Sequence, residues 1–433
     1  MIDPVLDMKE LSLVREYQFK KIKDVLNFSV NSKFYKKFYE AHDIDIHNIE
    51  SFENFKILPQ TDATYLQQEN LDFLTVDRTA IATVFSSGGT TGHPKIICYD
   101  KPSWEDYIIS SSRRWDYMGV TNNDFVGLMS NFDGLSMGGP AQQRALEYKG
   151  IPACCIGTSA TDEFVVKIIK TLGVSFLNSL TPTLITFTQK LENIGLNCRT
   201  LGIKKLGTAG EPLTDRKRNY LQEKWGAPVF DKYGATEIGM FAAECHLHNG
   251  NHILENMLYY ELVEPGTNKN SENNEGELVV TTLINKSMPL IRYNTKDIVR
   301  IVREPCGCGF NSPRVFFLGR SKETIYLQDA VKLTHEHFDA ALDGIKGVGL
   351  DYQVVHHREL GIDFLKIRVE VDAENTNNIT RERITTSIIN CSLPYARGVK
   401  KGIYSEPVVE LMSPGSLPRT SRLKIKERIK STT

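Results

Sequence analysis

The sequence predicts an α/β protein with a large N-terminal domain of mixed sheets and helices over residues 1–320 and a small α+β domain over residues 321–433. From about residue 80 to 300, short apolar runs alternate with helical patterns, which is typical of an α/β domain. After residue 319 the strand-like runs become shorter and one helical stretch follows. A chain of 433 residues that is 41% hydrophobic is long enough to bury two to three cores.

The spacing of apolar residues places the individual elements along the chain. Residues 12–41 have the spacing of amphipathic helices, and residues 265–274 are a polar loop. Elsewhere, runs rich in β-branched residues predict strands, and a period near 3.6 predicts helices. The expected strands are 81–85, 125–129, 174–178, 276–284, 352–357 and 364–371, and the expected helices are 163–172, 214–225 and 379–390.

The charge balance argues against partners that require a strong electric field. With 52 basic and 53 acidic residues the formal net charge is -1, so we expect neither nucleic acid nor a membrane surface as a partner. Residues 1–21 lack the continuous apolar stretch of a signal peptide or membrane span, which predicts a cytoplasmic protein. The eight cysteines are irregularly spaced, which argues against a disulfide framework and leaves thiols available as metal ligands.

The strongest local signal is a loop rich in glycine and hydroxyl side chains between two apolar runs. Its glycines let the backbone turn tightly and aim N–H groups at an anion, and its hydroxyls and terminal lysine add donors and positive charge. This chemistry suits a polyphosphate, although a plain Gly/Ser turn is the alternative. The candidate residues are Ser86, Ser87, Gly88, Gly89, Thr90, Thr91, Gly92 and Lys95.

This loop and the motifs that follow it in order resemble the adenylate-forming superfamily of acyl-CoA synthetases, adenylation domains and luciferases, and more narrowly the phenylacetate–CoA ligase family. The resemblance runs from about residue 20 to the C-terminus, although the family usually has one glycine where this chain has Gly88 and Gly89. It implies that ATP and Mg²⁺ convert a carboxylic acid to an acyl-adenylate, whose acyl group then passes to an acceptor. Lys95 is expected among the catalytic residues.

Two later segments match the family's nucleotide site. Residues 207–212 resemble the strand end and loop beside adenine, where small residues let the base lie against the backbone. In residues 231–237 the resemblance implies an aromatic residue stacked on adenine, Thr236 bonded to the α-phosphate, and Glu237 as the Mg²⁺ ligand, for which a hard carboxylate is suited. A strand-turn-helix without a ligand is the alternative. The residues assigned to the nucleotide are Ala209, Gly210, Glu211, Pro212, Asp231, Tyr233 and Gly234.

The resemblance extends to the ribose and to the hinge between domains. Asp297 matches the aspartate that accepts hydrogen bonds from both ribose hydroxyls, a role suited to two acceptor oxygens, and Arg320 is expected near the same ribose and phosphates. A surface aspartate in a turn is the alternative for Asp297. Lys322 occupies the hinge position, and Lys296 stands where the family often has glycine or arginine.

Near the C-terminus, residues 417–425 resemble the superfamily's terminal motif, and Lys424 stands where its catalytic lysine stands. An ammonium beside the carboxylate and α-phosphate stabilises the charge of in-line attack. The alternative is a solvated basic face over residues 422–430. The chain has Leu423 where the family has glycine, and residues 328–330 lack the glycine of the loop that lines the thiol tunnel in relatives.

Four residues form a candidate structural zinc site: Cys245, His252, Cys306 and Cys308. Three thiolates and an imidazole suit tetrahedral Zn²⁺, and phenylacetate–CoA ligase relatives carry a similar set. His246 or His248 could replace His252, and unrelated cysteine turns are the alternative.

Residues 131–139 resemble the start of the helix that borders the acyl substrate in relatives, and a helix N-terminus favours a carboxylate. Large apolar side chains here could line an aryl pocket, although such residues are more often plain core. The pocket candidates are Phe132, Ser136, Met137, Gly138, Ala209 and Met240.

Together these motifs predict an aryl or arylacetic acid–CoA ligase. A second interpretation keeps adenylation but delivers the acyl group to a carrier-protein phosphopantetheine or an amine, and a third is a non-catalytic nucleotide-binding scaffold. The expected ligands are ATP, Mg²⁺, structural Zn²⁺, a small carboxylic acid, and CoA or phosphopantetheine as acceptor. A homodimer remains open.

Overall fold

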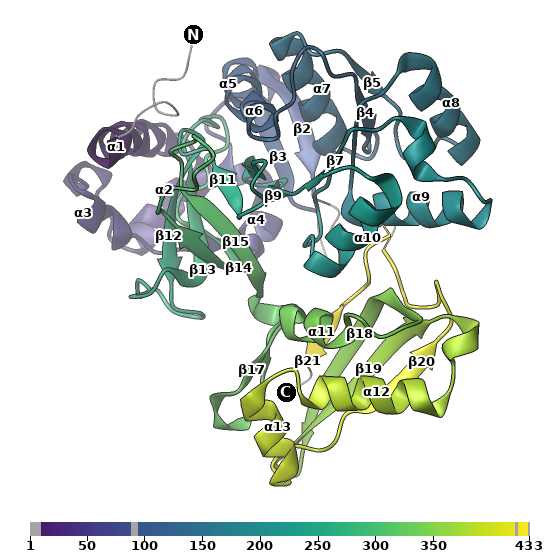
Figure 1. Cartoon of the computed structure of the whole chain (residues 1–433). Coiled ribbons are helices and arrows are strands. Elements are labelled where there is room, and N and C mark those ends of the chain that lie inside the picture. Colours follow the sequence, from purple (N-terminus) through teal and green to yellow (C-terminus); the bar gives the residue numbers. More distant parts are fainter. Residues whose placement is uncertain (1–9, 88–93, 421–422, 432–433) are drawn as a thin grey trace. The chain divides into compact units, whose positions relative to one another are not determined.

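The computed structural model describes residues 10–87, 94–420 and 423–431 (Figure 1). It divides into two compact units, the first formed by residues 1–210 and 222–316 and the second by residues 211–221 and 317–433. The second unit therefore includes the segment 211–221, which the sequence analysis assigned to the N-terminal domain. The division of function between two domains at residue 320 stays a prediction.

The first unit contains a five-stranded parallel sheet in the order β5-β4-β6-β7-β8. The predicted strands at 125–129 and 174–178 and the predicted helix at 163–172 are confirmed as β4, β6 and α8. The elements are β4 (Val126–Met129), α7 (Gly138–Lys149), β5 (Ala153–Cys155), α8 (Asp162–Leu172), β6 (Phe176–Ser179), α9 (Thr181–Asn193), β7 (Lys205–Gly207) and β8 (Val229–Phe230). Helices α7, α8 and α9 lie around this sheet (Figure 1). Helix α10 (Asp215–Trp225) crosses the boundary between the units, with residues 215–221 in the second.

A second sheet is mixed and has eight strands. Seven of them follow the order β12-β13-β14-β15-β11-β10-β9, and β1 pairs with β14. Its strands are β1 (Thr61–Asp62), β9 (Lys232–Ala235), β10 (Gly239–Glu244), β11 (Asn251–Ile253), β12 (Leu258–Val263), β13 (Glu275–Thr282), β14 (Tyr293–Val302) and β15 (Arg314–Arg320). A separate antiparallel pair, β2 (Ile81–Ser86) and β3 (Ile96–Asp100), leads into α5 (Lys101–Ser112) and α6 (Arg114–Tyr117).

Four helices precede these sheets: α1 (Leu11–Ser29), α2 (Lys33–Ala41), α3 (Phe52–Lys56) and α4 (Ala63–Gln68). The first two confirm the predicted amphipathic helices. The Gln18 amide donates to the Glu255 carbonyl (3.0 Å), and the Tyr35 hydroxyl donates to the Pro289 carbonyl (3.1 Å). These bonds anchor α1 and α2 to segments more than 200 residues away along the chain.

The second unit is built on a four-stranded sheet in the order β20-β19-β18-β21. Phe338, Ile384 and Ile388 project from its helices into a core shared with Tyr352 and Ile367 of the sheet. Its other elements are β16 (Ile325–Tyr326), β17 (Lys332–Leu333), α11 (His335–Leu342), β18 (Val348–Glu359), β19 (Ile362–Val371), α12 (Asn378–Ile389), α13 (Leu393–Lys400), β20 (Val408–Met412) and β21 (Ile429–Ser431).

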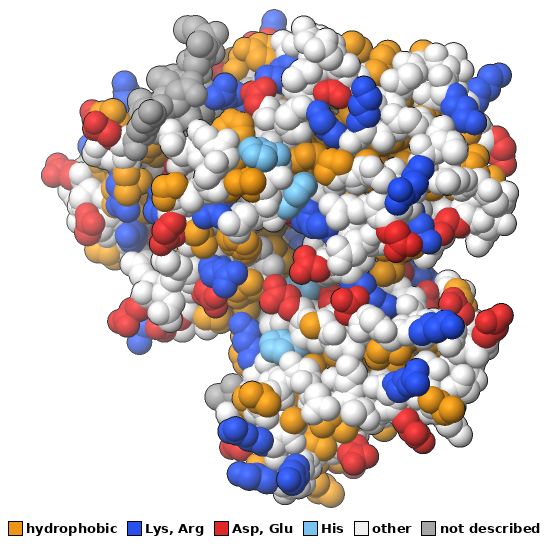
Figure 2. Space-filling view, viewed as in Figure 1, with side chains coloured by type: hydrophobic (Ala, Val, Ile, Leu, Met, Phe, Trp, Pro, Cys, Tyr) orange, Lys and Arg blue, Asp and Glu red, His pale blue; other side chains and the backbone are white. Residues whose placement is uncertain are grey.

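The surface in Figure 2 mixes basic and acidic side chains over the visible face. No helix formed by the described residues combines the length and the apolar character needed to cross a bilayer.

A buried ion pair connects the strands of the mixed sheet. Arg292 immediately precedes β14 in a left-handed conformation (φ 46°) and is 1% exposed. Its guanidinium donates two hydrogen bonds to the Glu261 carboxylate (3.0 and 2.9 Å) and one to the Leu58 carbonyl, and its N–H donates to the Thr281 hydroxyl (3.0 Å). Every charged atom of the pair therefore has a partner, which a buried charge requires.

Replacing Arg292 with methionine should lower the free energy of unfolding of the first unit by about 3–5 kcal/mol, because the Glu261 carboxylate is left buried without its partner. Arg300→Met, on the strand β14 that Arg292 precedes, is the matched control, since its pair with Glu275 is exposed and worth less than about 1 kcal/mol. All three tryptophans belong to the first unit, so their fluorescence during urea unfolding measures both effects. Equal losses in the two variants would contradict this account of Arg292.

Candidate active site

The predicted site residues follow strands of the parallel sheet. Since β4, β6, β7 and β8 are parallel, their carboxyl ends lie at the same edge. The loops after β4, β7 and β8 contain residues 131–137, 209–210 and 231. The chain passes from β4 to β5 on one side and then to β6 on the other, so the strand order reverses at β4. Ligands of open α/β sheets bind outside the carboxyl ends at such a point.

The glycine-rich loop joins two antiparallel strands, β2 and β3, as predicted. The Ser87 N–H donates to the Lys95 carbonyl (3.0 Å), and the Ser86 N–H donates to the Leu135 carbonyl (2.8 Å). The Ser87 hydroxyl is buried and has no hydrogen-bond partner among the described residues, which leaves it available to a ligand. Five predicted loop residues lie outside the described part of the chain: Gly88, Gly89, Thr90, Thr91 and Gly92.

Lys95 and Glu237 form an ion pair with side chains only 19% and 7% exposed. The pair joins the base of the glycine-rich loop to the turn at 236–238, between β9 and β10. Thr236 lies half-buried in the same turn. An ammonium suits phosphate oxygens and a carboxylate suits Mg²⁺, so the pair has the donor types that a magnesium–nucleotide complex needs.

A second pair of predicted residues meets beside the same hairpin. The Tyr233 hydroxyl donates to Asp297 Oδ2 (2.7 Å), and the Asp297 N–H donates to the Thr295 hydroxyl (3.1 Å). At Gly234 a Cβ atom would lie 2.3 Å from the Gly239 carbonyl oxygen, so only glycine permits this close approach of β9 and β10. The hairpin therefore places Tyr233 and Glu237 within one rigid element.

The segment 131–139 leads into α7. Met137 is buried and Phe132 is half-buried, while Ser136 and Gly138 lie in the turn and first position of the helix. A Cβ at Gly139 would lie 2.5 Å from the Asn131 carbonyl, so glycine is required there too.

Two other pocket candidates are also positioned by backbone hydrogen bonds. The Met240 N–H donates to the Tyr107 hydroxyl (3.2 Å). The buried Ala209 accepts at its carbonyl from the Thr181 N–H (3.1 Å), and Gly210 follows in a left-handed conformation (φ 86°).

Some predicted nucleotide residues have different surroundings. Glu211 and Pro212 belong to the second unit, where the Glu211 carboxylate accepts from Lys217 Nζ (2.7 Å) and Arg428 Nη2 (3.3 Å). Although burial opposes it, the charges of Lys217 and Arg428 lower the pKa of Glu211 to about 2. The Asp231 carboxylate accepts from Asn251 Nδ2 (3.3 Å), which ties it to β11.

Arg320 ends β15, and Lys322 lies exposed in the 3₁₀ turn that follows, Ser321–Glu323. Both belong to the second unit. Their predicted roles at the nucleotide and at the hinge stay predictions.

Lys424 lies in a tight loop of the second unit. The Thr420 N–H donates to the Lys424 carbonyl (2.8 Å), and the Lys426 N–H donates to the Pro418 carbonyl (2.8 Å). Arg419 anchors this loop through ion pairs with Asp351 (2.8 Å) and Glu370 (2.9 Å). Backbone hydrogen bonds and the Arg419 ion pairs therefore fix the position of this segment, and the role of Lys424 stays a prediction.

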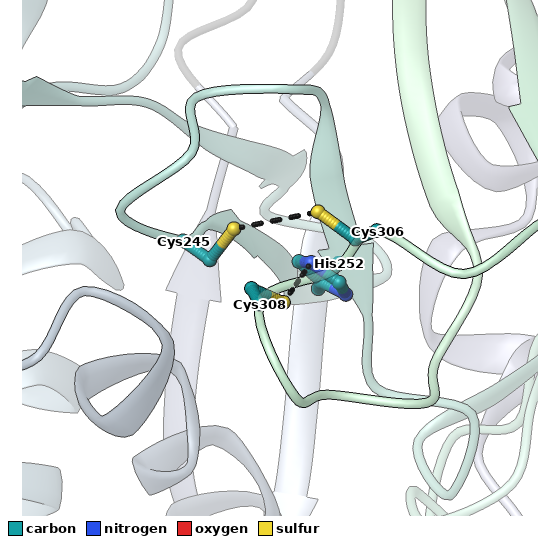
Figure 3. Close-up of side chains that lie close together, drawn as sticks. All are labelled: Cys245, His252, Cys306 and Cys308. Carbon is teal, nitrogen blue, oxygen red and sulfur yellow. Dashed lines mark hydrogen bonds between the residues drawn. The ribbon is translucent and has the colours of Figure 1, made fainter.

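The four candidate zinc ligands converge in one cluster (Figure 3). Their ligand atoms all lie within 4.8 Å of one another, with Cys245 Sγ 3.7 Å from Cys306 Sγ and Cys308 Sγ 3.3 Å from His252 Nε2. Zn–S bonds of about 2.3 Å in a tetrahedron place sulfur atoms about 3.7 Å apart, so the cluster has the dimensions of a zinc site.

The tautomer of His252 also fits metal binding. Its Nδ1 lies 3.1 Å from the Ser312 carbonyl, an acceptor that requires Nδ1 to carry the proton and leaves the Nε2 lone pair facing the thiols. Burial raises the pKa of Cys245 to about 12 and lowers the pKa of His252 to about 4. The predicted substitute His248 instead contacts Glu244 (3.3 Å), outside the cluster.

Comparison with known proteins gives matches along most of the chain. The AMP-binding enzyme C-terminal domain family matches residues 335–430. The phenylacetate-coenzyme A ligase of Thermus thermophilus is 24% identical over 440 residues, which is 98% of each chain. The phenylacetate-coenzyme A ligase of Escherichia coli K12 is 22% identical over 97% of this chain and 95% of its own. Over most of its length this chain is thus similar to phenylacetate–CoA ligases, and its C-terminal part matches the AMP-binding enzyme family.

Solved structures agree on the fold. A 2-hydroxyisobutyryl-CoA ligase in the postadenylation state in complex with 2-HIB-AMP has a TM-score of 0.81 and 22% identity, covering 95% of this chain and 88% of its own. ATP-bound MatB from Rhodopseudomonas palustris has a TM-score of 0.61 and 15% identity, covering 81% of this chain and 68% of its own.

Left-handed backbones occur in three places where the resemblance implies a glycine: at Lys296, where glycine or arginine is common, within residues 328–330, and at Leu423. Lys296, Asp329 and Leu423 all have left-handed backbones, with φ values of 61°, 55° and 61°. Glycine adopts this conformation freely, whereas other residues pay about 1–2 kcal/mol. The chain therefore keeps at these positions the backbone conformation that glycine favours, even though the side chains differ.

Two residues near the site were missed by sequence reasoning. Tyr107, on α5, positions Met240, and no local motif identifies it. Lys232 lies between Asp231 and Tyr233 but is 3% exposed. Its position between two residues of the predicted nucleotide site was the available signal, and the motif match drew attention to those neighbours instead.

Proposed function

We propose that this chain uses ATP and Mg²⁺ to convert a carboxylic acid to its acyl-adenylate and then transfers the acyl group to the thiol of CoA. The observation that carries the proposal is the pairing of Glu237 and Tyr233, both on the β9–β10 hairpin that follows β8, with Lys95 and Asp297. The names of the relatives favour an aryl or arylacetic acid.

In the first step, the acid carboxylate attacks the α-phosphorus of ATP and pyrophosphate leaves. Lys95 and the Ser87 hydroxyl would bind phosphate oxygens, with Thr236 on the α-phosphate. Mg²⁺, held by Glu237, would neutralise charge on the phosphates. Asp297 would accept hydrogen bonds from the ribose hydroxyls, and the Tyr233 ring would stack on adenine.

Lys424 would stabilise the charge that develops between the carboxylate and the α-phosphate. Lys322 would then act as the hinge that exchanges the adenylation arrangement for the thiol-transfer arrangement. In the second step the thiol attacks the acyl carbonyl, and AMP is the leaving group. The acid would lie beside residues 132–138, Ala209 and Met240.

The acceptor of the acyl group has a second candidate besides CoA. Residues 328–330 lack the family's glycine, and the Gln328 N–H is held by Asp363 (2.9 Å). A carrier-protein phosphopantetheine or an amine is therefore the alternative to CoA, and a nucleotide-binding scaffold without catalysis is the alternative to both.

The proposal is tested by pyrophosphate release from ATP and Mg²⁺ across aryl, arylacetic and aliphatic acids, with and without CoA. We expect acid-dependent release that CoA accelerates, with acyl-CoA as product by mass spectrometry. Release that is indifferent to CoA would favour the carrier-protein or amine acceptor. No release with any acid in this panel would favour the scaffold.

Replacing Lys424 with alanine should slow adenylation by at least about 100-fold, because a charge that stabilises the transition state is lost. Lys426→Ala is the matched control, since Lys426 is exposed in the same loop and should retain near-full activity. The assay is single-turnover formation of acyl-AMP. Equal rates in the two variants would remove Lys424 from the mechanism.

We also propose that the cluster of Cys245, His252, Cys306 and Cys308 holds one structural Zn²⁺. Four protein ligands leave no open position, so the ion would stabilise the fold and take no part in the reaction. Zinc would connect the β10–β11 loop to the turn that follows β14.

Purified enzyme should contain about one zinc per chain by elemental analysis, as a closed tetrahedral site binds a single ion. The His252→Ala variant should lose the zinc and have a lower melting temperature. The matched control, His248→Ala, should keep both the zinc and the melting temperature of the wild type. Zinc retained in His252→Ala, or lost only in His248→Ala, would contradict the ligand set.

A further inference from the structure

Lys232 is buried, and among the described residues it forms no ion pair with a carboxylate, although the charge of Asp231, its neighbour in the sequence, acts on it. Its side chain is 3% exposed, and among the described residues its hydrogen-bond acceptors are two neutral amides, Gln142 Oε1 (3.1 Å) and Asn178 Oδ1. Burial, and secondly the charge of Arg114, hold the pKa of Lys232 well below its usual range. A buried ammonium is costly unless a negative charge or strong acceptors compensate it.

The two amides connect Lys232 to the proposed acid site. Asn178 lies at the end of β6 and donates to Gln142 Oε1 (2.7 Å), and Gln142 in turn donates to the Gly138 carbonyl (2.7 Å). A Cβ at Gly207 would lie 2.7 Å from Asn178 Oδ1, two residues before Ala209. The network therefore reaches the first turn of α7, which directly follows the proposed acid-binding residues 131–137. It also reaches the end of β7, which precedes Ala209.

Further donors without acceptors lie in the same neighbourhood. The Trp115 ring centroid is 5.6 Å from Lys232 Nζ, and its indole Nε1 is buried with no partner among the described residues. Arg114 is 1% exposed, and its Nη2 is equally buried and unpaired in the described part of the chain. Buried donors of this kind normally have acceptors, so this region has an excess of hydrogen-bond donors over the acceptors that the described residues direct at them.

From this excess we infer that Lys232, with Asn178 and Gln142, determines which acid the enzyme accepts. The preferred acid carries an oxygen acceptor, such as a second carboxylate or a hydroxyl, at the end remote from the reacting carboxylate. This inference rests on the proposed function. A lysine ammonium has three donors, and the two amides use two of them. A substrate oxygen would supply the missing acceptor, whereas an apolar end would leave it unpaired.

The inference is tested with acids matched in length: pentanoate against glutarate, and phenylacetate against 4-hydroxyphenylacetate. In the wild type, kcat/KM should favour the member with the extra oxygen by at least about tenfold, because sites built around buried polar groups reject analogues that lack the partner. In Lys232→Met this preference should disappear, mainly through KM. A loss that is the same for both members of each pair would make Lys232 structural and overturn the inference.

Two further variants separate specificity from folding. Gln142→Glu places a carboxylate beside Lys232 without removing a side chain, and should selectively weaken use of glutarate. Lys205→Met is the matched control, because Lys205 starts β7, pairs with Asp124 (3.3 Å) and should leave the preference unchanged. Unaltered glutarate preference in Gln142→Glu would also count against the inference.

Binding measured without turnover distinguishes this inference from the proposed function. Titration of tryptophan fluorescence, to which Trp115 contributes, should show tighter binding of the oxygen-bearing acids in the wild type and equal binding in Lys232→Met. If this difference in binding is observed but no acid causes pyrophosphate release, the proposed function is contradicted and the inference about Lys232 is not. If acids cause pyrophosphate release but Lys232→Met does not change the preference for oxygen-bearing acids, the inference is contradicted and the proposed function is not.

Discussion

The parallel pairing of β4 with β6, β7 and β8 is the constraint on which the candidate site depends. Parallel strands bring their carboxyl ends to one edge, and the loops after them carry residues that are up to about one hundred positions apart in the sequence. A one-residue shift in any pairing would exchange the two faces of that strand. The register that buries Leu128, Leu177 and Leu206 thus also positions the site.

The β9–β10 hairpin adds the groups that the parallel sheet cannot supply. It starts directly after β8 and belongs to the mixed sheet, so one short element connects both sheets. The absence of a side chain at Gly234 allows its strands to approach closely, and Tyr233 and Glu237 are then placed by backbone geometry alone. Their partners, Asp297 and Lys95, come from β14 and from the end of the glycine-rich loop.

Sequence reasoning worked where a structural feature is encoded in nearby residues or in residue type. The two strands that flank the glycine-rich loop were predicted from their apolar runs, and the four cysteine and histidine candidates that the structure gathers in one cluster were predicted from their ligand chemistry. The functions assigned to these residues stay predictions. Contacts that need distant strand pairings could not be predicted in this way, which is why the Lys232 network and the Tyr107 bond to Met240 were missed. The compact units also divide the chain differently from the predicted boundary, because Glu211 pairs with Lys217 and with Arg428, far along the chain, and so groups with the second unit.

Two buried basic residues of the first unit, Arg292 and Lys232, differ in how completely their charges are compensated. Arg292 is fully compensated, with a bidentate carboxylate and a carbonyl, as expected of a group that only stabilises the fold. Lys232 has no carboxylate, only two amide oxygens and an aromatic face, and the unpaired donors of Arg114 and Trp115 lie nearby. A fold under selection for stability alone would replace such a lysine with an apolar residue at little cost. Its hydrogen-bond network reaches the first turn of α7, where we propose that the acid binds, so a ligand oxygen could supply the missing acceptor.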